Sequence, residues 1–489
     1  MRISIIGTGY VGLTTGAALA SLGHQVRGFD INQGLIEALV ESRLPFYEPG
    51  LTELVAAQGA AGRLSFSNEI VQAGAEAELV FICVGTPPAT VEGMPDVSQV
   101  EKSLEMIATA LTPRTVVVLK STVPIGTGDK AALILSRKSG GLLPPGNVAV
   151  NPEFLREGTA LEDFFHPDRV VLGVRGDLSR NRLLELYGWA KAPLVLTDRR
   201  TAEAIKYIAN AFLATKISFA NEVARVCASL EVSAVDVLQA IGLDRRIGPD
   251  FLEPGVGFGG SCLPKDLAAL IFTARSVGLE PVLLEAVEAI NRTQPEWVVE
   301  QMERALFRIP DDARETVGSA RVAVWGLSFK PGTDDTRSSP ALELVDSLVM
   351  RGHEVITYDP LARLPETAEA EGRERLCPRA GDPYAAVRGA DALILATAWP
   401  EFKRIDWRRV RRLMSGVSPV VVDGRNALEP ALLLSFGFVY VGVGRVGRAE
   451  WGRTGEGDGN VPRHRRGRFH RLTPGREAGG LGPQSGGSG

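Results

Sequence analysis

Short apolar runs alternate with stretches of helical spacing through the first part of the chain. Arg2–Ile6 is one such run, and a glycine turn and a helical stretch to about Leu22 follow it. His24–Asp30 (HQVRGFD) predicts a second strand. Further strand-like runs lie at 78–84, 115–120 and 147–150. Runs of β-branched residues that alternate with helices are typical of a parallel sheet with helices on both faces.

The pattern changes between Asp198 and Arg304, where no strand-like run occurs. Thr201–Leu230 keeps helical spacing throughout, which predicts one long helix. A glycine-rich segment at 253–262 interrupts the helical pattern, and a further helical stretch begins at Lys265. This part of the chain therefore predicts a helical spacer domain.

The third part repeats the first in outline. RVAVWG at 321–326 matches the opening strand, HEVITYD at 353–359 matches HQVRGFD, and DALILATAW at 391–399 matches ELVFICVGT. Another strand is predicted at 419–423. We therefore expect an α/β protein with two Rossmann-like doubly wound domains, joined by a long central helix and a helical spacer domain.

The expected division of the chain has four parts. The first Rossmann-like domain covers 1–197, the central helical domain 198–304, the second Rossmann-like domain 315–445, and a tail 446–489. The tail holds eight Arg and four acidic residues with many Gly and no apolar periodicity, so it is predicted to be disordered. Its RHRRGRFHR run could attract a polyanion, and the alternative is a solvated tail without a catalytic role.

Composition and charge argue against several kinds of partner. The 489 residues are 45% hydrophobic and 23% charged, and the net charge is −4, which gives no electrostatic case for a nucleic-acid or membrane partner. The four Cys and five His show neither a disulfide framework nor metal-ligand spacing, so no metal is expected. A reducing, cytoplasmic compartment is the default expectation. The uncharged stretch 3–26 is long enough to span a bilayer, but its glycine spacing favours a strand, a tight turn and a buried helix.

A glycine motif follows the opening strand. GTGYVG places Gly7 at a tight turn, Gly9 where a pyrophosphate can approach the backbone, and Gly12 where helix and strand pack closely. Asp30 ends the next strand, where a carboxylate accepts hydrogen bonds from ribose hydroxyls and repels a 2′-phosphate. These features predict a site for NAD rather than NADP.

The densest cluster of unusual residues is GVGFGGSCLPKD at 255–266. It delivers one thiol, Cys262, to the start of a helix beside Lys265. That setting predicts a thiol pKa below its free value of about 8.5. Asp266 follows four residues later on the same helical face. An inert core cysteine is the alternative, and this is the role assigned to Cys83, Cys227 and Cys377.

Other candidate residues lie on the long helix and on loops. Lys206 and Asn210 are four residues apart on one helical face, where they either steady an oxyanion or form an ordinary amphipathic edge. Glu153 and Glu157 lie in NPEFLREG directly after a strand, as catalytic loop residues or as solvated acids.

The second half has no G-x-G-x-x-G turn, so a second dinucleotide is not expected there. Its opening strand is followed by GLSFK at 326–330. Lys330 and Arg337 are candidates for phosphate contacts, and two surface cations near a turn are the alternative.

These motifs together resemble the UDP-glucose/GDP-mannose dehydrogenase family over about residues 1–445. The matching pieces, in order, are GTGYVG, GTP at 85–87, STVPIGT at 121–127, NPEFLREG, the Lys206/Asn210 pair, RIG at 246–248, GVGFGGSCLPKD and GLSFKPGTDDTRSSP at 326–340. The resemblance implies an N-terminal NAD domain, a central dimerisation domain and a C-terminal UDP-sugar domain, in homodimers or larger homo-oligomers.

The resemblance also implies a reaction, the four-electron oxidation of a sugar C6 alcohol to a carboxylate with two NAD⁺ used in turn. Cys262 would capture the intermediate aldehyde as a thiohemiacetal, because an aldehyde has a hydride to give only after a nucleophile makes it tetrahedral. The thioester formed next is hydrolysed. In this mechanism Lys206 and Asn210 stabilise oxyanions, Asp266 holds the catalytic water and Glu153 acts as base.

The residues carried over by position form two sets. The cofactor set, in which Thr122 also counts as catalytic, is Gly7, Gly9, Tyr10, Val11, Gly12, Asp30, Leu35, Thr86, Thr122, Glu157, Lys265 and Arg337. The substrate set, in which Arg246 comes from a partner subunit, is Glu153, Phe154, Leu155, Arg156, Glu157, Lys206, Asn210, Arg246, Phe251, Leu252, Glu253, Pro254, Gly255, Gly259 and Lys330.

Within the family, FLEPGVGFGGSC and RIG favour UDP-glucose, which would be oxidised to UDP-glucuronate. The alternative substrates are GDP-mannose and a UDP-N-acetylhexosamine. A two-electron hydroxyacid dehydrogenase also places a Lys and an Asn on one helix, but it has no need of Cys262 and gives one NADH per substrate instead of two. A non-catalytic NAD-binding scaffold is a third hypothesis.

Overall fold

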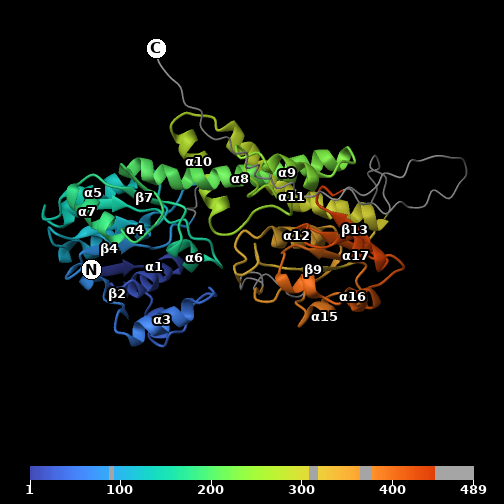
Figure 1. Ribbon diagram of the computed structural model, residues 1–489, viewed down its shortest axis with the longest axis horizontal. Helices are drawn as coiled ribbons and strands as arrows, with labels where there is room; N and C mark the ends of the chain where they lie inside the picture. The colour runs from blue at the N-terminus through green and yellow to red at the C-terminus, as the bar shows by residue number, and fades with distance from the viewer. Residues whose placement is uncertain (88–92, 308–317, 364–376, 446–489) are drawn as a thin grey trace, which may run out of the picture. The chain divides into compact units, whose positions relative to one another are not determined.

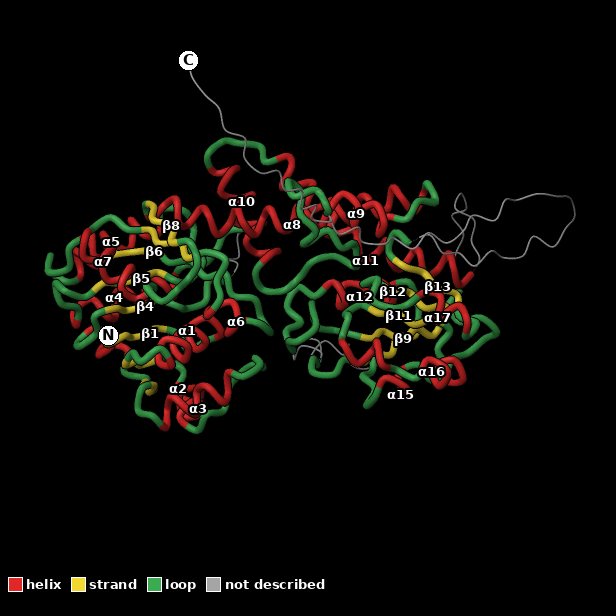
Figure 2. The backbone as a smooth tube through the Cα atoms, in the orientation of Figure 1, coloured by secondary structure: helices red, strands yellow, loops and turns green. Residues whose placement is uncertain are grey.

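The computed structural model describes residues 1–87, 93–307, 318–363 and 377–445. Its strands form two separate sheets, drawn in yellow in Figure 2. The first sheet has eight strands in the order β3-β2-β1-β4-β5-β6-β7-β8, and β7 runs antiparallel to β6 while the other pairs are parallel. Its strands are β1 (Arg2–Ile6), β2 (Gln25–Phe29), β3 (Leu64–Ser67), β4 (Leu79–Ile82), β5 (Val116–Leu119), β6 (Val148–Val150), β7 (Val170–Gly173) and β8 (Leu194–Thr197).

Helices cover both faces of this sheet. Alternate side chains of β4 explain the two layers, since Leu79 and Phe81 enter one core while Val80 and Ile82 enter another. The helices are α1 (Tyr10–Ser21), α2 (Gln33–Val40), α3 (Leu51–Ala60), α4 (Ser98–Ile107), α5 (Thr127–Lys138), α6 (Ala160–Phe165) and α7 (Asp177–Leu186).

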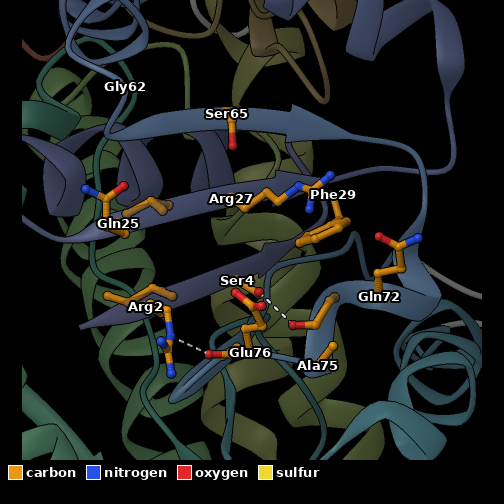
Figure 3. Close-up of a pocket in the computed structure, with 14 residues that line it drawn as sticks. Arg2, Ser4, Gln25, Arg27, Phe29, Gly62, Ser65, Gln72, Ala75 and Glu76 are labelled. Atoms are coloured by element: carbon orange, nitrogen blue, oxygen red, sulfur yellow. Dashed lines mark hydrogen bonds between the residues drawn. The ribbon is translucent and has the colours of Figure 1, made fainter.

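Part of one face of β1–β3 remains polar and forms a pocket (Figure 3). Ser4 and Arg27 line it, and Ser4 donates a hydrogen bond to the carbonyl of Ala73 at 2.7 Å. The pocket lies along the strands, whereas ligands of doubly wound sheets bind at the carboxyl ends of the strands. It contains none of the predicted site residues.

A 31-residue helix, α8 (Arg199–Ser229), follows the first sheet (Figure 1). It begins two residues before the predicted start because the carboxylate of Asp198 caps the backbone N–H of Thr201. The helices α9 (Ala234–Gly242), α10 (Leu263–Ser276) and α11 (Val282–Phe307) follow, and α8 packs against each of them.

The second sheet has five parallel strands in the order β10-β9-β11-β12-β13. Its strands are β9 (Arg321–Trp325), β10 (Glu354–Tyr358), β11 (Ala392–Leu395), β12 (Val420–Asp423) and β13 (Val439–Gly442). One face packs with α12 (Pro340–Met350), α8 and α11, and the other with α15 (Pro383–Ala386), α16 (Trp407–Leu413) and α17 (Pro430–Ser435).

The expected fold class is confirmed, with two mainly parallel sheets and a long central helix. Four strands, β3, β7, β8 and β13, were not predicted. β3 (LSFS) alternates apolar and polar residues and shows no apolar run, whereas β7 (VVLG), β8 (LVLT) and β13 (VYVG) each hold an apolar run of only three residues. The domain boundaries stay predictions, and the tail 446–489 lies outside the described residues. No described helix is long and apolar enough to cross a membrane.

Candidate active site

One face of α8 binds three other segments of the chain at four points. Glu203 accepts hydrogen bonds from the backbone N–H groups of Gly126 and Gly128, at the end of the STVPIGT loop. Further along α8, Lys206 pairs with Glu153, Asn210 with Asp266, and Asn221 with Gly255. The intervals between these residues, three, four and eleven, are each close to a whole number of helical turns, so their side chains form a row along one face of α8.

The pair of Lys206 and Glu153 is buried. The ammonium nitrogen of Lys206 lies 3.1 Å from Oε1 of Glu153, and the two side chains are 5% and 6% exposed. The other oxygen of Glu153 accepts the backbone N–H of Leu155 at 2.7 Å. Burial lowers the pKa of Lys206, but Glu153, Cys262 and Asp266 together raise it above its ordinary value, so the amine stays charged. Glu153 is therefore not a solvated loop acid.

Cys262 lies at the start of α10 in a half-buried position, with the hydroxyl of Ser261 3.6 Å from its sulfur. The predicted lowering of its pKa is wrong. Burial raises the pKa of the thiol, Glu153 and Asp266 raise it further, and Lys206 and the Ser261 hydrogen bond oppose them without prevailing. The resting thiol therefore keeps its proton.

Asp266 binds the ammonium of Lys265, which explains why Lys265 does not lower the pKa of Cys262. The ammonium of Lys265 donates to Oδ1 of Asp266 at 2.7 Å, and the amide of Asn210 donates to Oδ2 at 2.6 Å. Asp266 is 1% exposed, so both oxygens are held in fixed directions. The charge of Lys265 is thus satisfied by its neighbour on the helix instead of the thiol.

Glu157 joins the loop after β6 to two other loops. Its carboxylate lies 3.3 Å from the hydroxyl of Ser261, 3.5 Å from that of Thr333 and 3.3 Å from the guanidinium of Arg337. Burial and Asp335 raise the pKa of Glu157 to about 7, against the opposing effects of Arg337 and Lys330. Arg337 is thus a paired cation, bound to Asp335 at 2.7 Å as well as to Glu157.

Lys330 lies in the loop after β9 and is half buried. Burial lowers the pKa of Lys330, and the charge of Glu157 is the largest opposing influence. An amine in such a place gains from an added anion, because an anion would offset the burial penalty. Lys330 is therefore not simply a surface cation beside a turn, whereas Arg337 is 65% exposed and ion-paired.

The glycine turn has the shape that a dinucleotide requires. Gly7 has a φ of +89°, and a Cβ on Gly12 would lie 1.9 Å from the carbonyl oxygen of Gly7. A Cβ on Gly9 would meet nothing within 4 Å, so space is open above this residue at the N-terminus of α1. Oδ2 of Asp30 accepts the backbone N–H of Thr8 at 2.9 Å, which orients this half-buried carboxylate. The residues present fit a bound pyrophosphate and ribose.

The other predicted cofactor residues lie around this turn or on the next strand ends. The hydroxyl of Tyr10 donates to Glu48 at 2.5 Å, and Val11 is half buried on the same helix. Leu35 lies in the first turn of α2, where its N–H is capped by Asn32. Thr86 donates to the carbonyl of Thr122 at 2.8 Å and so connects the loops after β4 and β5.

The predicted substrate residues of the glycine-rich loop are mostly buried. Leu252, Pro254, Gly255 and Gly259 are buried, while Glu253 is exposed. A Cβ on Gly259 would lie 2.1 Å from the carbonyl of Ser338, so this glycine lets the loop touch the segment after β9.

Phe251 holds a φ of +63°, a backbone conformation that bulky residues rarely adopt. Phe154 is half buried, and its ring centroid lies 5.3 Å from the ammonium of Lys206.

Two predicted substrate residues, Arg156 and Arg246, are exposed and ion-paired. Arg156 pairs with Asp163 at 2.5 Å. Its carbonyl accepts the hydroxyl of Tyr10 at 3.3 Å, and its charge adds to burial in lowering the pKa of Lys330, so it lies near other predicted site residues. Arg246 is 85% exposed and pairs with Asp244 at 2.6 Å, so within this chain it contacts no other site residue. Its expected reach into a partner subunit stays a prediction.

Arg425 is a site residue that the sequence analysis missed. Its guanidinium donates to the carbonyls of Ala396 at 2.8 Å, Gly257 at 3.1 Å and Phe329 at 3.3 Å. Burial lowers its pKa to about 10. The signal in the sequence was its place directly after a buried strand, VVVDGR, where doubly wound sheets bind ligands.

Asp359 explains why the second sheet differs from the first. It ends β10 as Asp30 ends β2, but it is fully buried and accepts the N–H groups of Leu327 and Ser328 and the indole N–H of Trp399. These bonds go to Oδ2, and Oδ1 accepts the N–H groups of Leu361 and Ala362, so both oxygens are engaged by the chain itself. This agrees with the absence of a second dinucleotide motif.

Two sheets of Rossmann-type strand order, one with a dinucleotide turn, define a dinucleotide-dependent α/β protein. Three family models match the chain, namely the NAD binding domain, central domain and UDP binding domain of the UDP-glucose/GDP-mannose dehydrogenase family, over residues 1–191, 200–293 and 323–430. The chain belongs to this family, and NAD is its cofactor.

Individual relatives cover almost the whole described chain. UDP-glucose 6-dehydrogenases of Rhizobium meliloti and Pseudomonas aeruginosa are 43% and 42% identical over 91% of this chain and over 100% and 98% of their own lengths. The solved structure of a UDP-glucose dehydrogenase from Pyrobaculum islandicum matches with a TM-score of 0.80 at 38% identity, covering 91% of this chain and 98% of that one.

Proposed function

We propose that the chain is a UDP-glucose 6-dehydrogenase, which oxidises UDP-glucose to UDP-glucuronate with two NAD⁺. The observation that carries the proposal is the convergence of the Lys206–Glu153 and Asn210–Asp266 pairs on one thiol, Cys262. The identity to UDP-glucose 6-dehydrogenases along the chain supports the choice of substrate. A buried cation and an amide beside a nucleophile suit a reaction with oxyanion intermediates.

The cofactor fits the turn at Gly9 and Asp30, and when bound it accepts a hydride in each of two oxidations. Cys262 and Lys206 act after the first oxidation has left an aldehyde at C6 of the sugar. Because the thiol of Cys262 keeps its proton, addition forms the S–C bond and passes that proton to the former carbonyl oxygen. The charged amine of Lys206 stabilises the oxygen while negative charge develops on it.

The second oxidation leaves a thioester on Cys262, and water has to cleave it. Asp266, fixed by Lys265 and Asn210, would hold this water, and Glu153 would take one of its protons. Water oxygen bonds to the acyl carbon, the C–S bond breaks, and the sulfur leaves as a thiol. The product is a carboxylate that leaves the site with the rest of the sugar nucleotide.

The test is a count of NADH released per sugar nucleotide by the full chain, with UDP-glucose, GDP-mannose and a UDP-N-acetylhexosamine. We expect two NADH per UDP-glucose, and we expect Cys262→Ala to form no uronate while Cys262→Ser stalls as a slowly resolving adduct. One NADH per substrate would favour a two-electron dehydrogenase, and a preference for another sugar nucleotide would favour a sibling activity. Near-normal uronate formation by Cys262→Ala would exclude the covalent route.

We propose in addition that two copies associate through α8. Ile208, Phe212, Phe219 and Val226 are 48–64% exposed and follow one another at intervals of four, seven and seven residues. Apolar side chains at this spacing form a stripe that a second helix covers. A homodimer or a larger homo-oligomer would also bring a second copy's Arg246 within reach of other surfaces.

The expected compartment is the reducing cytoplasm. A nucleophilic thiol has to stay reduced to act. Cys262 is only half buried, so solvent oxidants can reach it in an oxidising compartment. Recovery of the active enzyme in the cytoplasmic fraction, and not in an oxidising compartment, would test this expectation.

A further inference from the structure

The loop that carries Cys262 has no regular structure of its own. Gly255–Ser261 contains neither helix nor strand, and Gly257 and Gly260 have φ values of +113° and +85°. Glycine loses more conformational freedom on ordering than any other residue. Contacts from outside the loop therefore have to fix the position of the sulfur.

Asn291 on α11 makes a double contact with this loop. Its Oδ1 accepts the backbone N–H of Phe258 at 2.8 Å, and its Nδ2 donates to the carbonyl of Phe258 at 3.0 Å. The amide thus serves both backbone groups of one residue, as a neighbouring strand would. The same Oδ1 would lie 2.9 Å from a Cβ on Gly257, so the amide fills the space beside that glycine.

Phe258 is fixed by its side chain as well. Its ring is buried in a small core formed with residues of α8, α10 and α11, including Ala214, Leu267 and Val287. Phe258 is the last buried hydrophobic side chain before Cys262, and two glycines and Ser261 separate them. Within this short segment the N–H of Gly260 donates to the carbonyl of Arg337 at 3.0 Å, and the hydroxyl of Ser261 lies 3.3 Å from Glu157. Phe258 thus fixes the buried end of the segment that leads to the sulfur.

Two other amides hold the loop farther from the thiol. Asn221 accepts the N–H of Gly255 at 2.8 Å, and Gln294 donates to its carbonyl at 2.8 Å. Each of these side chains makes one bond to Gly255, which lies seven residues before Cys262. Asn221 therefore offers a matched comparison for Asn291, with the same residue type on the same loop.

We propose that Asn291 is a positioning residue for Cys262, which acts by clamping the backbone of Phe258. The proposal deepens the proposed function, because positioning the sulfur serves the covalent steps. The location of the sulfur can nevertheless be measured without any sugar nucleotide, so the two ideas can fail separately.

The first experiment measures the rate of Cys262 labelling by iodoacetamide in the full chain without nucleotides. Asn291→Leu leaves both backbone groups of Phe258 without their partner, so the loop opens and labelling accelerates about tenfold or more. Asn221→Leu and the exposed control Arg292→Gln on α11 change the rate less than threefold. Equal rates for Asn291→Leu and wild type would overturn the proposal.

A second variant separates positioning from general loss of packing. In Asn291→Asp, a protonated carboxyl group still accepts from the N–H and donates to the carbonyl of Phe258, whereas a carboxylate faces that carbonyl with no proton. Partial burial and the facing carbonyl oxygen raise the pKa of this carboxyl group above its ordinary value of about 3.9. With 4,4′-dithiodipyridine, which labels thiols at acid pH, the ratio of variant to wild-type rates therefore stays near one at pH 5 and rises severalfold above pH 7. A ratio that does not change with pH would overturn the clamp.

Turnover completes the test. Asn291→Leu is expected to release less than two NADH per UDP-glucose, because aldehyde escapes before capture, while the KM for NAD⁺ changes less than twofold. If wild type oxidises no UDP-glucose, the proposed function fails and the labelling rates still decide the clamp. Unchanged NADH yield together with unchanged labelling would exclude a positioning role for Asn291.

Discussion

The thiol of Cys262 combines a buried setting with a nearby fixed cation. Burial and two carboxylates keep its proton in place at rest, and Lys206 is the group that favours negative charge there. Such a thiol adds to an aldehyde only as its proton moves to the new oxygen. The resting enzyme is thereby protected from unwanted alkylation and oxidation, because the thiolate is the reactive form.

Lys206 should therefore matter more for the rate than for binding. Replacing it in Lys206→Met removes the cation beside the developing oxyanion, so kcat should fall about 10²- to 10³-fold, with a smaller change in the KM for UDP-glucose. Steady-state NADH formation measures both constants. Arg200→Met, an exposed cation on the same helix, is the control and should leave kcat within about twofold. A loss confined to KM would contradict the oxyanion role.

At the scale of elements, α8 organises the site. It carries Glu203, Lys206, Asn210 and Asn221 on one face, and they bind the loop after β5, the loop after β6 and both ends of the segment 255–266. Its opposite side exposes the apolar stripe proposed for association. One helix thus links the catalytic pairs to the surface where a second copy would bind.

The proposed association predicts a change in oligomeric state. Phe212→Asp combined with Phe219→Asp places two carboxylates in the middle of the stripe, so the dimer should dissociate at micromolar concentrations because buried unpaired charge is costly. Sedimentation velocity measures the state. Leu142→Asp, an equally exposed apolar position away from α8, is the control. An unchanged dimer in the double variant would place the interface elsewhere.

Much of this architecture could be predicted from the sequence because it repeats locally. The strands β1, β2, β4, β9 and β10 are short apolar runs at fixed distances from glycine turns, and α8 keeps one helical period throughout. The pairing of Lys206 with Glu153 could not be predicted, since their backbones come from elements more than fifty residues apart.

The sign of the shift in the Cys262 pKa failed for the same reason. Lys265 is close in sequence, but Asp266 binds it, and the carboxylate of Glu153 comes from a distant loop. Local sequence showed Lys265 and Asp266 side by side, but not that they pair with each other or that Glu153 lies near the thiol. Arg425 was not predicted for a similar reason. Its three acceptors are backbone carbonyls of other loops, and no sequence motif marks them.

On the scale of the whole molecule, two sheets of similar construction have diverged at their strand ends. Asp30 keeps a half-exposed carboxylate beside an open glycine, whereas Asp359 is buried with its oxygens engaged by the chain itself. The first sheet therefore offers a dinucleotide site. The second offers Lys330 and Arg425 beside its strand ends, which suits an anion without a second adenosine ribose.

The stability of the whole protein should depend on pH through two buried acids. The pKa of Glu203 and that of Glu157 are each raised to about 7, chiefly by burial, from an ordinary value of 4.5. The folded protein therefore binds protons between pH 4.5 and 7 that the unfolded chain has released, so the free energy of unfolding falls as pH rises through this window.

Urea unfolding at pH 5, 6, 7 and 8 measures this dependence. Glu203→Gln cannot titrate, so its stability relative to wild type should rise steadily from pH 5 to 7 and level off above. Glu37→Gln, an exposed acid on α2, should run parallel to wild type at every pH. A constant difference between Glu203→Gln and wild type would contradict the shifted titration.

Because α8 is one continuous helix, the enzyme should also be sensitive to an insertion or deletion within it. One residue inserted between Asn210 and Asn221 would turn everything beyond it by about 100° and advance it by about 1.5 Å. The contacts of Lys206 and Asn210 would remain, whereas Asn221 would lose its hydrogen bond to Gly255 in the loop that leads to Cys262. Insertions in exposed loops would leave these contacts in place, whereas an insertion within this stretch of α8 would separate the two halves of the site.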